Sequence, residues 1–75
     1  MANENSFQTR QYVEWDWGKG TARGQIRERF EREVERTLKG SKVTRQGSAD
    51  NPAYLIEQDD GAEILKLGSE IRAQA

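Results

Sequence analysis

The stretch GQIRERFEREVERTLKG, residues 24–40, decides the fold of this 75-residue chain, and two structures fit it. As a helix it would gather Ile26, Phe30, Val34 and Leu38 on one stripe and end at Gly40, a residue that commonly follows helices. Opposite charges four residues apart would add weak support. The stripe is thin, however, with one apolar residue per turn, and no capping residue stands just before it.

The same stretch also has the alternation of a strand. Every apolar residue from 22 to 38 occupies an even position, and the odd positions hold only polar residues. Successive side chains of a strand point to opposite faces, so this parity predicts one ionic and one mixed face. A turn at Lys39-Gly40 would then place Leu38 opposite Ser41 and Arg36 opposite Val43. Spacing alone leaves helix and strand nearly balanced.

The segment before this stretch predicts a half-buried strand over residues 11–17. Its alternation places Val13, Trp15 and Trp17 on one side. Tyr12 and its alternate neighbours Glu14 and Asp16 lie on the other side. The sequence GKG at 18–20 predicts the turn that ends this strand, because glycine accepts positive φ.

Toward the C-terminus, AYLIEQDDGAEILKL at residues 53–67 predicts a hairpin. Asp60-Gly61 is a dipeptide favoured in two-residue turns. That turn would place Ile56 opposite Leu65 and Tyr54 opposite Leu67, with strands at 53–58 and 62–67. Pro52 cannot donate a ladder hydrogen bond, so the first of these strands begins after it.

The composition excludes several kinds of chemistry. The chain has no Cys and no His, so it lacks thiolate ligands, disulfides and a neutral-pH base. Asp59 and Asp60 are adjacent, but they occupy a predicted turn exposed to water and lack calcium-loop spacing. We therefore expect no enzyme activity, no metal and no cofactor.

The remaining composition describes a small single domain with polar ends. Residues 1–10 show no periodicity, and we expect a mobile arm there, a domain over 11–71 and a short tail at 72–75. The opening residues lack the apolar core of a signal peptide, and no apolar run approaches the length of a membrane span. We expect a soluble cytoplasmic protein without membrane partners.

Three segments together carry a family resemblance: WDWGKGTARGQI, RTLKGSKVTRQGSADNPAYLIEQDDG and ILKLGSEI. In this order they resemble the hypervirulence-associated TUDOR domain family, small proteins of bacteria and fungi formerly catalogued as a domain of unknown function. The resemblance spans residues 12–71. It implies an all-β, small SH3-like (Tudor-like) barrel in which residues 22–38 are extended, and it implies no catalytic site or settled ligand.

With the resemblance, we expect strands near 11–17, 22–38, 41–46, 53–58 and 62–67, a short turn at 68–71, and a long central hairpin around Lys39-Gly40. The expected core is apolar and aromatic: Val13, Trp15, Ala22, Ile26, Phe30, Val34, Leu38, Val43, Tyr54, Ile56, Leu65 and Leu67.

Two site hypotheses follow from side-chain chemistry. Aromatic faces can hold a methylated Lys or Arg by cation–π attraction beside a carboxylate, and the candidate cage comprises Trp17, Trp15, Tyr12, Tyr54, Asp16 and Asp59. Simple packing is the competing interpretation for its large rings. The second candidate is a basic hairpin that tracks nucleic-acid phosphates through Arg36, Lys39, Lys42 and Arg45. An acidic pI of about 5.4 and the interleaved glutamates weigh against it.

A third hypothesis is a protein-interaction module that uses sheet edges or the long hairpin. We favour this one: a non-enzymatic binding domain with a protein partner, and nucleic acid as the alternative. We expect a monomer or a weak homo-oligomer.

Overall fold

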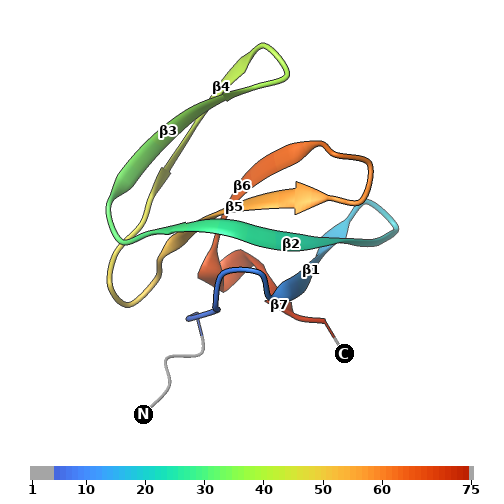
Figure 1. Cartoon of the computed structure of the whole chain (residues 1–75), viewed down its shortest axis with the longest axis horizontal. Coiled ribbons are helices and arrows are strands. Elements are labelled where there is room, and N and C mark those ends of the chain that lie inside the picture. The colour runs from blue at the N-terminus through green and yellow to red at the C-terminus, as the bar shows by residue number, and fades with distance from the viewer. Residues whose placement is uncertain (1–4, 75) are drawn as a thin grey trace.

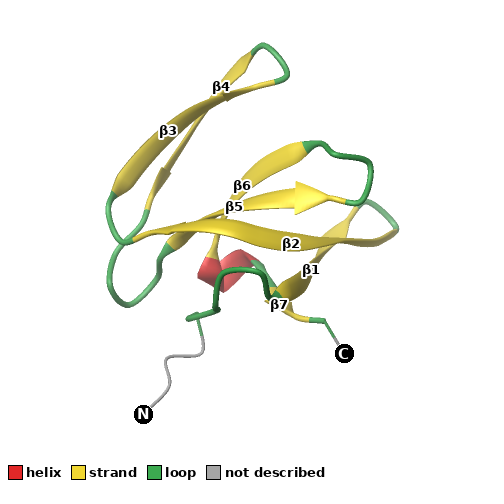
Figure 2. Cartoon of the chain, in the orientation of Figure 1, coloured by secondary structure: helices red, strands yellow, loops and turns green. Residues whose placement is uncertain are grey.

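The computed structural model describes residues 5–74. Its elements in chain order are the strands and one 3-10 turn β1 (Tyr12–Trp17), β2 (Gly20–Phe30), β3 (Glu33–Leu38), β4 (Ser41–Gln46), β5 (Ala53–Gln58), β6 (Glu63–Leu67), η1 (Gly68–Glu70) and β7 (Arg72–Ala73). Figure 2 shows that strands dominate, with η1 as the single helical turn in the described part of the chain. The chain is all-β, and the prediction that residues 24–38 are extended is confirmed.

Five strands form one antiparallel sheet in the order β6-β5-β2-β1-β7. β1, β2, β5 and β6 make a meander, and after η1 the short strand β7 returns to pair with β1. This arrangement is a small SH3-like, Tudor-like barrel. Among residues 5–74 no ladder joins β6 to β7, so the barrel is open at that edge.

The β3–β4 hairpin forms a separate two-stranded sheet between β2 and β5 in the sequence. In Figure 1 it rises from the end of β2 and diverges from the β5–β6 hairpin. The predicted long strand at 22–38 is therefore wrong in one respect: it is two strands, with a bend at Glu31 and Arg32 that lets the chain leave the main sheet.

A β-bulge explains why the even-numbered apolar residues of this segment do not all share one face of the sheet. Ile26 pairs with Ile56 and Phe30 pairs with Ala53, and the register shifts between Ile26 and Glu28. The extra residue reverses the side-chain direction along β2. Ile26 and Phe30, both at even positions, therefore lie on opposite faces of the sheet.

The register of the β3–β4 hairpin is the predicted one. Leu38 pairs with Ser41 and Arg36 with Val43 across the turn. Lys39 itself has a φ of +52°, and the glycine that follows it has a φ of +79°, as a two-residue turn with two left-handed positions requires.

The register of the β5–β6 hairpin corrects the prediction by one residue. The Gln58 N–H donates to the Ala62 carbonyl at 2.7 Å, which leaves a loop of residues 59–61 closed by Gly61 at a φ of +88°. Leu55 therefore faces Leu65, and Ile56 and Tyr54 face Ile64 and Lys66. A one-residue slip moves every side chain of the partner strand to the other face.

Two apolar clusters make up the core, one on each face of β5. We call the first the barrel core; it consists of Phe7, Val13, Trp15, Ile26, Tyr54, Ile56 and Ile71. We call the second the hairpin core; it consists of Phe30, Val34, Ala53, Leu55 and Leu65. Of the predicted core residues, four are only partly buried and pack against these clusters: Ala22, Leu38, Val43 and Leu67. The prediction missed Phe7, Ala53, Leu55 and Ile71.

The chain ends contribute to the barrel core. Phe7, within the segment expected to be an arm, is buried, and its ring meets the Tyr54 ring edge-on at a centroid distance of 5.8 Å. A β-carbon at Gly68 would overlap the Asn5 carbonyl, so the N-terminal segment lies tightly against η1. The expected tail supplies β7. Residues 1–4 and 75 of those two segments lie outside the described residues.

Candidate binding groove

A groove separates the β3–β4 hairpin from the main sheet, where the two hairpins diverge in Figure 1. Its volume is about 520 Å³, within the range of ligand pockets. Three parts of the chain line it. β1 and β2 supply Trp15, Trp17 and Ala22; the β3–β4 hairpin supplies Leu38, Lys39, Ser41, Val43 and Arg45; and β5 and β6 supply Gln58, Glu63, Ile64, Leu65 and Lys66.

Trp17 is the most exposed aromatic side chain of this groove. It alternates with Val13 and Trp15 along β1, so it points to the same face as two buried residues. Trp15 is 3% exposed, whereas Trp17, at the end of the strand beyond the packed core, is 72% exposed. A large apolar ring left in water at the edge of a groove is typical of an interaction surface.

The opposite wall of the groove comes from the β3–β4 hairpin, and Leu38 and Val43 supply its apolar surface. Leu38 and Val43 lie on the hairpin face that carries Val34, and both are half-buried against the hairpin core. Their outer portions line the groove opposite β6. The groove thus has apolar surface on two sides.

The charges around the groove are mostly basic. Within residues 5–74, Lys39 and Lys66 form no ion pair. Arg45 does form one: its Nε lies 3.3 Å from Oε1 of Glu70. Glu63 is the acidic residue in the lining. An anionic group on a ligand would therefore meet two lysines without competing carboxylate partners.

The structure brings together only part of the predicted aromatic cage. Trp15 and Trp17 line the groove, but the Tyr54 ring is fully buried. Its hydroxyl accepts from the Phe7 N–H at 2.8 Å and donates to the Asn5 carbonyl at 3.1 Å.

The other three members of the predicted cage lie elsewhere. Tyr12 and Asp16 lie on the other face of β1 from Trp17, and Asp16 accepts a hydrogen bond from Arg72 at 3.1 Å. Asp59 belongs to the β5–β6 turn and does not line the groove. No ring in the described residues stands opposite Trp17 to complete a cage of aromatic faces.

The four predicted nucleic-acid contacts do not form one surface. Arg36 lies over the Phe30 ring at 5.0 Å and 3.8 Å from a Glu28 oxygen. Lys42, on the other face of the hairpin, lies 3.7 Å from Glu35. Arg45 is held by Glu70, which leaves Lys39 at the turn as the one unpaired cation of the four within residues 5–74.

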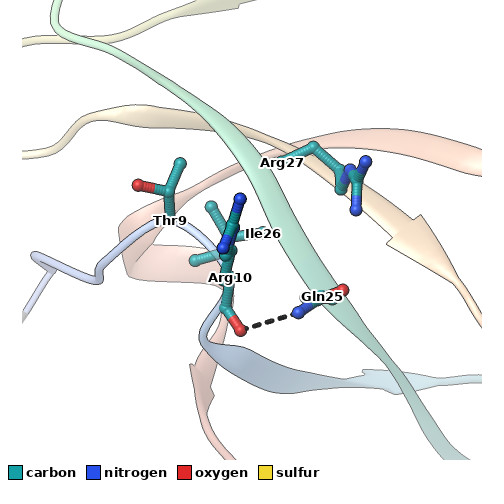
Figure 3. A pocket seen from close by; sticks show the side chains of 5 residues that line it. All are labelled: Thr9, Arg10, Gln25, Ile26 and Arg27. Atoms are coloured by element: carbon teal, nitrogen blue, oxygen red, sulfur yellow. Dashed lines mark hydrogen bonds between the residues drawn. The ribbon is translucent and has the colours of Figure 1, made fainter.

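A second, polar pocket lies between the N-terminal segment and β2, lined by Thr9, Arg10, Gln25, Ile26 and Arg27. Arg10 has a φ of +74°, and the Gln25 side chain donates to its carbonyl at 3.0 Å. Figure 3 shows the Arg10 and Arg27 side chains on opposite sides of the β2 ribbon. The two guanidinium groups therefore do not converge on one point.

One arginine outside the groove has a shifted pKa. The Tyr54 hydroxyl and then the Glu31 carboxylate raise the pKa of Arg29 by hydrogen bonding. The described residues hold no group of three or more side chains arranged to bind a metal ion. In residues 5–74 no helix has the length and apolar character needed to cross a membrane.

The groove residues on β6 were not found from the sequence, because Glu63, Ile64 and Lys66 meet the β3–β4 hairpin only through the tertiary fold. The sequence did contain a signal for the opposite wall of the groove, which the β3–β4 hairpin supplies. Leu38 and Val43 are apolar residues near the tip of a charged hairpin, where a purely solvated hairpin would carry polar ones.

The fold is an open Tudor-like barrel with a partly apolar groove between its two hairpins, an architecture typical of small binding modules. Comparison with protein families agrees: residues 11–71 match the TUDOR domain of hypervirulence associated proteins, and the chain belongs to this family. No curated protein and no solved structure matched the chain significantly.

Proposed function

We propose that this domain is a non-enzymatic binding module whose ligand is a segment of another protein, held in the groove between the β3–β4 hairpin and β6. The observation that carries the proposal is the exposure of Trp17 beside the apolar wall of Leu38 and Val43. Burial of a tryptophan in a complementary groove is a common source of interface affinity.

The chemistry of the groove favours a peptide over a small metabolite. The groove is partly open, and its lining combines apolar side chains with polar and mostly basic ones. A peptide chain can place apolar side chains against both walls and a carboxylate near Lys39 or Lys66. Catalysis has no support here, because the chain has neither His nor Cys and the groove contains a single carboxylate.

Selection from a random peptide library tests this proposal. Peptides of about ten residues, long enough to form one strand with flanks, are selected on the wild-type domain and measured on Trp17→Ala. We expect affinity to fall at least about thirtyfold in that variant, since large apolar hot spots contribute about 2 kcal/mol or more. Tyr12→Ala is the matched control, because Tyr12 is 52% exposed on the opposite face of β1. Peptides that bind both variants equally, or a selection without binders, would refute the proposal.

Nucleic acid is the second candidate, supported by the unpaired Lys39 and Lys66 at one groove. Its weakness is that Arg36, Lys42 and Arg45 already have carboxylate partners. Electrophoretic retardation of single- and double-stranded oligonucleotides over a salt series decides it. Binding whose logarithm falls linearly with log salt would favour this function, and absence of retardation at low salt excludes it.

A further inference from the structure

β6 is the edge strand of the main sheet, and one of its two edges faces away from β5. In an antiparallel pair the backbone groups of successive residues point alternately toward and away from the partner. The hydrogen bond from Gln58 N–H to the Ala62 carbonyl shows which residues of β6 point their backbone groups toward β5. Ile64 and Lys66 therefore bond to β5, and the N–H and C=O groups of residues 63, 65 and 67 point outward.

The Leu67 backbone confirms that these residues point away from β5. The Leu67 N–H donates to Oε1 of Glu70 at 2.8 Å, and the same oxygen accepts from Nε of Arg45 at 3.3 Å. The side chains of Glu70 and Arg45 thus close the β6 edge at its C-terminal end. Toward the β5–β6 turn, the outward N–H groups of Glu63 and Leu65 have no partner within residues 5–74.

We propose that the partner segment binds in an extended conformation as an added strand on β6. Its backbone pairs first with the exposed Glu63 and then with Leu65, which is 2% exposed in the free domain and becomes accessible when the β3–β4 hairpin moves aside. This inference rests on the proposed function of the groove. Its main support is that the unpaired part of the edge coincides with the groove lining: both residues line the groove. An unpaired edge beside apolar surface is the arrangement that strand addition uses.

The two faces of β6 specify what the added strand must carry. Ile64 faces the barrel core, on the side of Trp17, whereas Leu65 belongs to the hairpin core, on the side of Leu38 and Val43. Side chains of an added strand alternate between these sides, so apolar residues are required on both. The segment is an apolar run, in contrast to the alternating polar pattern of a solvated strand.

Charge complementarity selects the flanks of that segment. The cations at the groove are Lys39, Lys66 and the Glu70-bound Arg45, against Glu63 as the carboxylate of the lining. A carboxylate next to the apolar run would meet one of the two free lysines, whereas a lysine or arginine there would be repelled. The ligand class is therefore a short apolar segment of a partner protein, with an acidic residue at its end.

Peptides selected on the wild-type domain test the strand mode through the variant Glu63→Pro. Glu63 is the exposed first residue of β6, where proline is tolerated, and its N–H makes no ladder bond. The variant removes one outward donor, and Glu63→Ala is its matched control because it removes the same carboxylate and keeps the donor. We expect Glu63→Pro to bind about five- to tenfold more weakly than Glu63→Ala, the effect of one lost hydrogen bond.

A scan of N-methylated peptides tests the same mode without altering the protein. Methylation of alternate peptide amides, those that face β6, is expected to abolish binding, while methylation of the intervening amides is tolerated. Peptides that depend on Trp17 but are insensitive both to Glu63→Pro and to the methylation pattern would overturn strand addition and leave groove binding intact. Loss of all Trp17-dependent binders would overturn both proposals.

Sedimentation of the free domain tests whether a second copy of the chain occupies the β6 edge. If the wild-type chain forms a dimer that Glu63→Pro dissociates and Glu63→Ala does not, the β6 edge is occupied by a second copy, which contradicts a heterologous peptide ligand. A monomer that binds the selected peptides one to one is the expected result.

Discussion

The β5–β6 hairpin and the β3–β4 hairpin are joined to the molecule in different ways. β5 pairs with β2 along its length, and its two faces are buried in separate cores. The β3–β4 hairpin has no ladder with any other strand in the described structure. It is held by Val34, Leu38 and Val43, which pack in or against the hairpin core, and by two ion pairs, Arg36 with Glu28 and Arg45 with Glu70. The β5–β6 hairpin is thus part of the main sheet, whereas the β3–β4 hairpin is attached to that sheet by side-chain contacts.

This difference has a functional consequence. Exposed ion pairs contribute little, about 0–1 kcal/mol each, so the position of the β3–β4 hairpin depends mainly on the apolar contact of Val34, Leu38 and Val43 with the hairpin core. Segments with few buried contacts open locally at lower free energy than the domain unfolds. The groove therefore has one rigid wall, from β1, β2 and β6, and one wall that can adjust to a ligand.

The largest effect should come from the barrel core. Ile56 is fully buried on β5. The substitution Ile56→Ala should lower the free energy of unfolding by about 2–5 kcal/mol, because a small core cannot collapse around the cavity. Domains of this size have little stability in reserve, so we expect this variant to be largely unfolded. Urea denaturation followed by circular dichroism measures it. A loss below about 1 kcal/mol would contradict the central role of β5.

The Tyr54 hydroxyl should have the next largest effect. In Tyr54→Phe the buried Phe7 N–H loses its acceptor, and the Asn5 carbonyl loses its donor. We expect a loss of about 1–3 kcal/mol and faster hydrogen exchange at the Phe7 amide. Tyr12→Phe is the control, because the Tyr12 ring is half exposed and its hydroxyl has no partner among residues 5–74. Equal stability of the two variants would mean that the N-terminal segment is not anchored by this hydroxyl.

A side-chain truncation in the hairpin core should affect the two hairpins differently. Val34→Ala removes two methyl groups from a buried side chain that is 2% exposed, which costs about 1.5 kcal/mol of hairpin docking. We expect faster amide exchange in β3 and β4, measured by mass spectrometry, with unchanged protection in β2 and β5. Acceleration of exchange to the same extent in all four strands would show that the hairpin opens only with the whole domain.

The smallest effect concerns the turn of the β3–β4 hairpin. Lys39 has a left-handed backbone, which disfavours most side chains but is tolerated by asparagine. Lys39→Asn should raise the thermal midpoint slightly, by an effect of about 0.5 kcal/mol. Lys39→Ala, which removes the same charge and keeps the strain, should not. Stabilisation by both substitutions would mean that charge, not backbone strain, is the relevant term.

The two hairpins also differ in how well the sequence predicted them. Lys39-Gly40 supplies both left-handed positions of a two-residue turn, so local chemistry determined the register there. At Asp60-Gly61 the same reasoning failed, because Gly61 closes a three-residue loop and the Asp60 carboxylate accepts from the Ala62 N–H at 2.9 Å. Both turn types use a glycine at that position, and only pairing with β2 and burial on both faces distinguish them.

Other features could not be predicted because their signal is not local. The bulge after Ile26 lies within a run of exposed charged residues, where an extra residue leaves no trace in the apolar pattern. Phe7 and Ile71 are single apolar residues in polar surroundings, and only the folded barrel shows that both fill one core. Trp17 was identified as a candidate ligand contact from its position at the end of β1, whereas the rest of the groove required the tertiary structure.

Nuclear magnetic resonance of the domain with a selected peptide tests strand addition in the groove, because it reports on the groove and the β6 edge together. We predict that the peptide shifts the Trp17 indole resonance and slows hydrogen exchange at the Glu63 and Leu65 amides. The Trp15 indole, which is buried, should change much less. Shifts confined to the second pocket around Arg10 and Arg27, with the Trp17 indole and the β6 amides unchanged, would contradict it.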